Sequence, residues 1–383
     1  MEAGEYKIRE LFQAAEGMPH DAERIGIYEQ AIDLAKQEKL ADLEIEAHRR
    51  MIWEQSFYQD MMQTFIMYPV LLGLVDRYVA ENGRMPQDIF LVLWTYKSLI
   101  GNCDVFHQVT RQQFEQMTED CIKRYWAAGY NRRSVCAIKM DFYAGIDLEL
   151  AKENYRDFLR QKRDSMSDCP GCERSEEVSF LLDCGQVEEA LAKSEPLFRK
   201  YGIYSCECQP GRISCTFIEY IVKRRLLGGE IHKNIEDRRA EYAATVRRYI
   251  LVKHMMQGKV GIMLIYYSIF EPEKVLGWFK KHYNFAETHH VPRYVMGFAM
   301  GMMLFLNRVR SGKKNGKLTY RMKLSPAYTL YREDGEYDIQ ELYAYYDGLA
   351  YDIAKKFEES QGRKEWVEFY QKVKDYKYSE ITE

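Results

Sequence analysis

The sequence predicts an all-α protein, an α-solenoid of stacked antiparallel helical hairpins. Apolar residues recur at three- and four-residue spacing in about fifteen segments, joined by short turns. Alternating β-branched runs long enough to build a sheet are missing. One amphipathic helix cannot bury its own apolar stripe, so consecutive helices are expected to stack. A compact, non-repetitive helical domain is the alternative.

The first hairpin is predicted at Asp21–Phe57, where two apolar-periodic segments follow one another. Asn82-Gly83 predicts a helix stop, and Pro86 predicts the start of the next helix, since its missing N–H is not needed there. Further helices in this part are predicted at Tyr68–Glu81, Pro86–Ile100, Val109–Ala128, Ser134–Tyr143 and Leu148–Arg163.

Helical periodicity continues to the C-terminus, with one short extended stretch near Leu318–Leu330. Glycine-rich breaks and composition suggest a helical-repeat region at 1–165, a second one at 166–310, and a basic loop with C-terminal helices at 311–383. The helices are predicted at Glu176–Leu182, Val187–Arg199, Ile213–Leu226, Asp237–Gln257, Val260–Ile269, Pro272–Tyr283, Tyr294–Arg310, Ile339–Glu359 and Glu365–Lys374.

Composition excludes several classes of protein. With 14% aromatic residues the 383-residue chain is not intrinsically disordered, and a net charge of −3 gives no global reason to bind nucleic acid. The longest apolar stretches, Val260–Phe270 and Tyr294–Leu306, are too short to span a bilayer, so no membrane partner is expected. The N-terminus lacks a basic region followed by an apolar run, which together with nine cysteines predicts a cytoplasmic protein with reduced thiols.

Two segments, Ala22–Ala35 and Cys184–Leu197, place a small residue on one side of a helix and bulky residues three and four positions away. They resemble helices of tetratricopeptide repeats, and Gly185 matches the turn glycine before the second helix of such a repeat. Glu271–Gly277 is similar to a third, degenerate copy. The resemblance implies a helical-repeat fold with a binding groove.

The middle and C-terminal parts also resemble a group of uncharacterised bacterial helical-repeat proteins, over roughly two thirds of the chain. That group has no known activity to carry over. Some of its members have a His shortly after the position of Cys206, where this chain has Cys208. The residues that carry the resemblance are Cys169-Pro-Gly-Cys172, Cys206, Val275-Leu276, Lys281-His282, Ile353–Phe357 and Gly362.

Cys169, Cys172, Cys206 and Cys208 form the strongest candidate site. A Pro-Gly turn between the first two aims both thiolates at one point, and the intervening hairpin can return the chain to bring the second pair close. Four sulfurs complete a tetrahedral Zn²⁺ site, which makes structural zinc the expected cofactor. Plain thiols and a redox pair are the alternatives, and Cys184 and Cys215 are spare candidates.

Three other features have a functional and a structural interpretation. His282, His289 and His290 share one turn with Glu287, where they are either a metal or acid–base group or solvated and capping residues. The basic segment Arg308–Lys323 is either a contact for an acidic partner or a solvated loop. Abundant tyrosines are expected to be mostly structural, with a minority in a groove: Tyr266, Tyr267, Tyr337, Tyr343, Tyr345, Tyr346 and Tyr351.

Gly297 and Gly301 show small-residue spacing inside an apolar helix, which predicts close helix packing. Walker, dinucleotide-binding, HExxH, GxSxG and EF-hand motifs do not occur. We therefore expect a non-catalytic scaffold that binds a protein or peptide, with a regulatory or peptide-sensing adaptor as a specific version. An enzyme whose residues converge only in three dimensions is the alternative.

Overall fold

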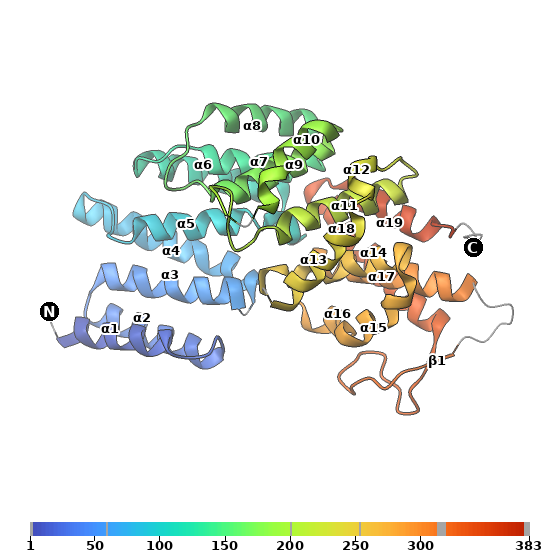
Figure 1. Ribbon diagram of the computed structural model, residues 1–383. Helices are drawn as coiled ribbons and strands as arrows, with labels where there is room; N and C mark the ends of the chain where they lie inside the picture. The colour runs from blue at the N-terminus through green and yellow to red at the C-terminus, as the bar shows by residue number, and fades with distance from the viewer. Residues whose placement is uncertain (1–2, 59, 200, 253, 312–318, 379–383) are drawn as a thin grey trace. The chain divides into compact units, whose positions relative to one another are not determined.

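A computed structural model describes residues 3–58, 60–199, 201–252, 254–311 and 319–378. Within these ranges the chain is all-α, and adjacent helices pack in pairs, as predicted (Figure 1). The α-helices are α1 (Ala3–Glu16), α2 (Ala22–Gln37), α3 (Ala41–Tyr58), α4 (Met61–Asn82), α5 (Ile89–Ile100), α6 (Arg111–Ala127), α7 (Arg133–Ala144), α8 (Leu148–Arg160), α9 (Pro170–Asp183), α10 (Val187–Ser194), α11 (Gly211–Leu226), α12 (Lys233–Glu236), α13 (Arg239–Val252), α14 (Val260–Phe270), α15 (Pro272–His282), α16 (Phe285–Thr288), α17 (Pro292–Ser311), α18 (Ile339–Gln361) and α19 (Lys364–Asp375). Short 3-10 helices are η1 (Cys103–Val105), η2 (Glu195–Phe198) and η3 (His254–Lys259).

The chain divides into two compact units, and each unit is assembled from three separate stretches of the sequence. The three regions expected from the sequence stay a prediction. Unit 1 comprises Met1–Cys103, Gln112–Ile138 and Asp157–Met166, and unit 2 comprises Asp104–Arg111, Lys139–Arg156 and Ser167–Glu383.

In unit 1 the predicted first hairpin is present as α2 and α3, and α1 packs against α2. Asp21 caps α2 because its carboxylate accepts hydrogen bonds from the backbone N–H groups of Glu23 and Arg24. Gly83 ends α4 in the left-handed conformation (φ +65°), which confirms the helix stop. The buried side chains shared by α1, α2 and α3 are Ile8, Phe12, Ala15, Tyr28, Ala31, Ile32, Ala35, Leu43, Ala47 and Met51.

His48 on α3 lies in this core without a hydrogen-bond partner for its Nε2 atom. Burial, helped by the charge of Lys36, lowers the pKa of His48 to about 4, against 6.5 for an exposed imidazole. The folded state therefore holds the neutral ring. The unfolded chain takes up a proton below pH 6.5, so stability is lost as the pH falls from 6.5 towards 4.

We expect the substitution His48→Phe to remove part of the acid sensitivity of folding. Because the pKa of His48 is about 4 in the folded state and 6.5 in the unfolded chain, the wild type should lose about 3 kcal/mol of its free energy of unfolding between pH 7 and pH 4. Denaturant unfolding at both pH values measures that difference, which should shrink by this amount in the variant. The exposed His290, replaced by Gln, is the control. Equal acid sensitivity of His48→Phe and wild type would contradict the assignment.

The closely packed helices α14 and α17 lie at the centre of unit 2, and α18 packs against α17. Gly261 of α14 and Gly301 of α17 allow this approach: a Cβ at Gly261 would lie 2.5 Å from the backbone nitrogen of Phe298, and one at Gly301 would lie 2.8 Å from Cβ of Leu264. The close packing predicted from the two glycines of α17 is thus confirmed at Gly301, whereas a Cβ at Gly297 would meet nothing within 4 Å. The apolar stretches of both helices are almost entirely buried, and none of the described helices has the length and apolarity needed to cross a bilayer.

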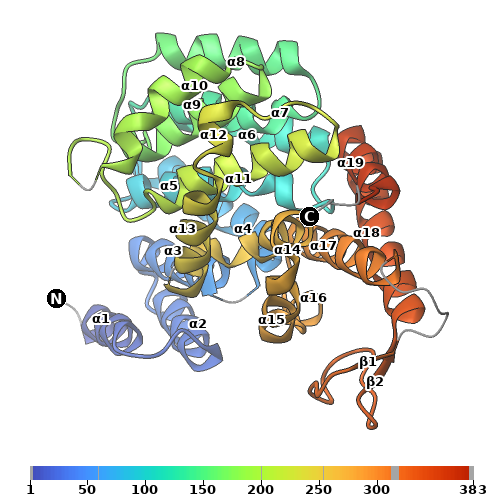
Figure 2. The same ribbon diagram turned by 45° about the vertical axis from the view of Figure 1, so that its right-hand side comes forward.

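Two short strands, β1 (Thr319–Arg321) and β2 (Glu336–Asp338), pair antiparallel in unit 2. β1 falls within the extended stretch expected from the sequence, and β2 leads directly into α18 (Figure 2). Asp338 caps that helix by accepting hydrogen bonds from the N–H groups of Gln340 and Glu341. β2 contributes the buried side chain of Tyr337 to a core that is otherwise built mainly by helices.

Candidate metal centre

The first cysteine pair lies at the N-terminus of α9. Cys169 is the N-cap residue, and its Sγ atom accepts a hydrogen bond from the N–H group of Cys172 at 3.3 Å. Pro170 occupies the first helical turn, where no donor is required. The pair was expected in a turn, with the helix beginning only at Glu176. The structure instead starts the helix six residues earlier, and the first helical turn aims the thiols.

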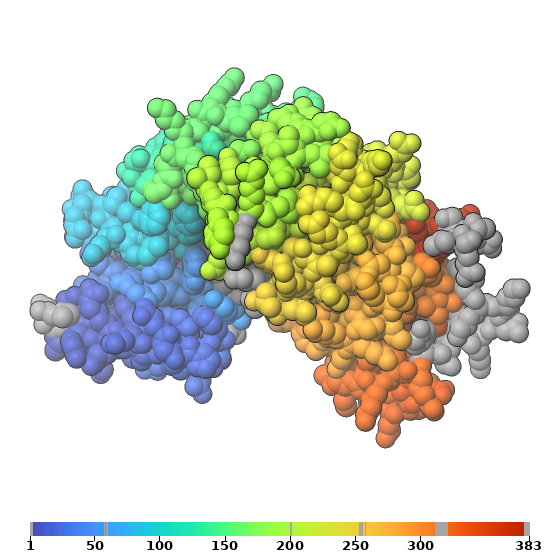
Figure 3. Space-filling view, in the orientation of Figure 1, coloured from blue at the N-terminus to red at the C-terminus, as the bar shows by residue number. Residues whose placement is uncertain are grey.

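The second pair lies in the loop between η2 and α11, which reaches the first pair because Gly171 has no side chain. A Cβ atom at Gly171 would lie only 2.4 Å from the carbonyl oxygen of Tyr204. Gln209 links the two segments, since its Nε2 donates to the Gly171 carbonyl and its Oε1 accepts from the Ile213 N–H, both at 3.2 Å. Figure 3 shows the segment after α10 at the surface in yellow-green, consistent with the strong exposure of Tyr201.

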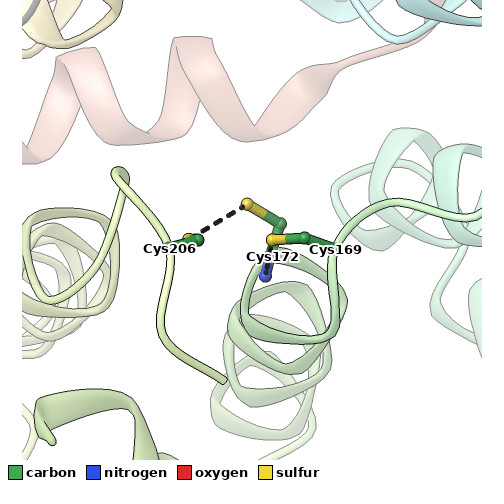
Figure 4. A group of neighbouring side chains, drawn as sticks. All are labelled: Cys169, Cys172 and Cys206. Carbon is green, nitrogen blue, oxygen red and sulfur yellow. Dashed lines mark hydrogen bonds between the residues drawn. The ribbon is translucent and has the colours of Figure 1, made fainter. Parts of the chain in front are cut away.

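Cys169, Cys172 and Cys206 come together with all three Sγ atoms within 4.8 Å of one another (Figure 4). The Cys172 and Cys206 sulfurs are 3.9 Å apart. A tetrahedral ion with bonds of about 2.3 Å requires sulfurs about 3.8 Å apart, so this spacing fits a metal and is far too long for a disulfide. The three thiols are thus able to hold a metal ion, and soft sulfur donors favour zinc over magnesium or calcium.

Cys208, the fourth predicted ligand, is not among the three sulfurs that lie within 4.8 Å of one another, although it interacts with Cys172. A hydrogen bond to the Cys208 thiol is the main cause that raises the pKa of Cys172, followed by burial, and the same contact lowers the pKa of Cys208. Burial and the neighbouring Cys172 raise the pKa of Cys206 to about 11. Without a cation the thiols of Cys172 and Cys206 therefore stay largely protonated at neutral pH, and a bound metal would have to displace their protons.

Arg212, the second residue of α11, extends the site. Its guanidinium donates to Glu176 Oε1 at 3.0 Å and interacts with the Cys172 sulfur. Burial by itself would lower the pKa of Arg212, but Glu176 and Cys172 outweigh it and raise the pKa. A fixed cation beside a ligating sulfur stabilises the thiolate form, as outer-shell groups of metal sites do.

The spare cysteines do not join the cluster. Cys215 is buried and lies 3.7 Å from a carboxylate oxygen of Glu219, and Cys184 ends α9. Among the residues that the structure describes, Cys169, Cys172 and Cys206 are the one group of three or more His, Cys, Asp or Glu side chains close enough to share an ion.

The three histidines of the 282–290 turn are separated by their packing. The ring of His282 lies 4.5 Å from that of Trp278, and burial lowers the pKa of His282 to about 4. His289 contacts Phe285 instead, and its Nδ1 accepts a hydrogen bond from the Val291 N–H. These contacts favour the structural interpretation of the turn.

The basic segment is only partly described. Lys313, Lys314 and Lys317 lie outside the described residues, whereas Arg308 is held over the ring of Tyr378 at 4.9 Å and Arg321 pairs with Glu336 at 3.5 Å. The proposed acidic-partner contact therefore stays a prediction.

Most of the singled-out tyrosines are core residues, as expected. Tyr343 and Tyr345 are half-buried, and Tyr351 is 43% exposed. The fully buried members are Tyr266, Tyr267, Tyr337 and Tyr346.

Sequence reasoning missed a set of interacting charges in unit 2, called the charged set below. Arg293 pairs with Asp104, Lys259 pairs with Glu219 at 2.8 Å, and charge interactions join both pairs to Asp141 and Arg212. One local signal existed: Arg212 and Arg293 are each the second residue of a helix, where the helix dipole disfavours a cation unless an acid compensates. The members are Asp104, Asp141, Glu176, Arg212, Glu219, Lys259 and Arg293.

Comparison with known proteins gives no relative: no family model, no curated protein and no solved structure matches this chain.

Proposed function

We propose that this protein is a non-catalytic scaffold whose unit 2 binds an extended segment of a protein or peptide partner. Paired helices support the solenoid form of this proposal. So does the junction between α9 and α10, where Gly185 adopts φ +76°, the turn position expected of a tetratricopeptide-like repeat. The same proposal includes three further points: a relation to the bacterial helical-repeat group, a cytoplasmic location, and an adaptor or peptide-sensing role.

The observation that carries this proposal is the environment of the charged set. The exposed fraction of its ion-paired side chains runs from 12% for Asp104 to 42% for Arg212. Nevertheless, burial is the largest influence on the pKa of Glu176 and Arg212, and also of Lys259 and Arg293. Groups that water reaches but protein largely surrounds are typical of a recess. The members of the charged set lie on η1, α7, α9, α11, η3 and α17. Because these elements follow one another along the chain, such a recess would run past successive helix pairs.

The mixture of signs indicates the kind of ligand. The charged set contains four carboxylates and three cations, which suits a polypeptide with both backbone polar groups and charged side chains. A polyanion such as nucleic acid would need an excess of cations. We therefore place a protein or peptide, and not nucleic acid, against this surface.

We further propose that Cys169, Cys172, Cys206 and Cys208 bind one structural zinc ion. The ion would fasten the start of α9 to the segment before α11. Glu176 lies further along α9, and Arg212 lies in the first turn of α11. An all-sulfur ligand set leaves no open position for catalysis, so the role would be to stabilise the fold.

Affinity capture from the native cytosol, with mass spectrometry of the retained proteins and peptides, tests the scaffold. We expect wild type to enrich a specific partner, and the variant Lys259→Gln to retain it at least about tenfold less, since an interfacial ion pair is worth about 1.5 kcal/mol or more. Arg156→Gln makes the same charge change at an exposed position of unit 2. Equal loss in both variants, or no enrichment by wild type, would contradict the proposal.

The alternative of an enzyme is favoured by one observation. Burial raises the pKa of Glu176 to about 7, although Arg212 opposes the shift. A carboxyl group that titrates near neutral pH suits general acid–base catalysis. Turnover of a small molecule from the same cytosol that Glu176→Gln abolishes, with no retained partner, would replace the scaffold by this alternative.

A further inference from the structure

A cavity of about 550 Å³ lies in unit 1, apart from the charged set and the cysteines. Its size falls within the range of ligand sites, about 300–1,000 Å³. It is formed by α2, α3 and α5 with one residue from the end of α1 and one from the 161–169 loop. The lining residues are Glu16, Arg24, Tyr28, Arg49, Arg50, Trp53, Glu54, Phe90, Leu91, Trp94, Thr95 and Ser165.

Aromatic side chains form much of the cavity wall: Trp53 from α3, and Phe90 and Trp94 from α5. Trp94 is held in place, because the Lys97 ammonium lies 3.4 Å from its ring centre and Phe90 lies 5.9 Å away. Leu91 is 40% exposed and also lines the cavity. Such a wall accepts a flat or bulky apolar group.

Arg49 supplies the polar recognition group. Only 9% of this residue is exposed, and its Nε donates to Asp88. Within the described part of the chain no hydrogen bond or ion pair engages its two terminal nitrogens. The other two arginines differ: Arg24 bonds to Glu54 and the Met18 carbonyl, and Arg50 bonds to Glu16 and Glu46.

A buried guanidinium with both terminal nitrogens available is a fork that matches the two oxygens of a carboxylate. Neither terminal nitrogen is fully shielded from solvent, so an anion that fills the cavity reaches both and gains their hydrogen bonds. The neighbouring tryptophans would hold whatever apolar group the carboxylate carries.

We propose that this cavity binds a carboxylate attached next to an aromatic or large aliphatic side chain. Arg49 pairs with the carboxylate, and Trp53 and Trp94 enclose the side chain. The C-terminal residue of a polypeptide and a free N-acylated amino acid share this chemistry. The site is separate from the unit 2 surface, so the proposal stands or falls independently of it.

Calorimetric titration of the full-length protein tests the site. The probes are N-acetylated tryptophan, phenylalanine and leucine, and N-acetylated hexapeptides that end in the same residues, each as free acid and as amide. We expect the acids to bind at least about tenfold more tightly than the amides, since a charge-assisted bidentate pair is worth about 1.5–3 kcal/mol. Tighter binding of hexapeptides than of single residues would identify a polypeptide terminus, and equal binding would identify the free acid.

Two variants locate the binding. Arg49→Lys keeps the charge but loses the fork, so the preference for acid over amide should fall by about tenfold. Leu91→Trp obstructs the cavity at an exposed position that should not disturb folding, and Ile66→Trp, 63% exposed and outside the cavity, is its control. Failure of every acid probe to bind wild type, equal affinity for acids and amides, or full binding by Leu91→Trp would overturn the proposal.

Discussion

Protein purified without added zinc is expected to contain about one equivalent of zinc, and the substitution Cys172→Ser to abolish it. The Cys172 thiol is 3.9 Å from that of Cys206 and also interacts with that of Cys208, so it is central to the cluster. Because ligand binding energy becomes folding energy, loss of the ion should lower the free energy of unfolding by about 4 kcal/mol or more. Elemental analysis and denaturant unfolding measure the two effects.

Cys184→Ser is the matched control, since Cys184 belongs to the same unit, has intermediate exposure and lies outside the cluster. It should keep its zinc and nearly all its stability. Chelation of the wild type should reproduce the loss seen in Cys172→Ser. A zinc content below about half an equivalent in wild type would argue for plain thiols.

A second variant determines how many sulfurs bind the ion. If Cys208 is the fourth ligand, Cys208→Ser should lose zinc and stability as Cys172→Ser does. Full zinc content in Cys208→Ser would instead support a site of three cysteines with an open position, which is the arrangement of catalytic zinc.

Gly261→Ala is expected to be the most damaging single-methyl change in the core of unit 2. The new Cβ atom would lie 2.5 Å from the backbone nitrogen of Phe298 and 2.6 Å from the carbonyl carbon of Gly297. Both contacts are with backbone, which no rotamer change can relieve, so α17 must move away from α14. Overpacking of this kind costs about 3 kcal/mol or more.

Gly297→Ala is the control for this prediction. It adds the same methyl group to the facing helix, where a Cβ atom would meet nothing within 4 Å. Since alanine favours a helix by up to about 1 kcal/mol over glycine, this variant should be neutral or more stable. Denaturant unfolding compares the two proteins, and equal stability would show that α14 and α17 are not as close as described.

The sequence by itself determined where most helices lie. Apolar periodicity and helix stops act within one or two turns, and they correctly placed α2, α3, α11, α14 and α18 as well as the stop at Gly83. It also nominated the cysteines, because Cys169 and Cys172 are near neighbours and the second pair follows one hairpin later.

Local patterns failed where structure depends on distant contacts. The Pro-Gly pair predicts a turn because these residues disfavour a helix interior. The structure has the first turn of α9 there, where proline is well tolerated. The approach of Cys206 depends on the absence of a side chain at Gly171 and on the hydrogen bonds of Gln209, neither of which is visible in spacing alone.

Only the tertiary structure revealed the charged set and the cavity beside Arg49. Arg49 and Trp94 are 45 positions apart, and Asp104 meets Arg293 across 189 positions. Helix formation is encoded in short stretches of chain, whereas a binding surface arises when side chains from several helices converge. That convergence follows from how the helices pack, and packing is a property of the whole fold.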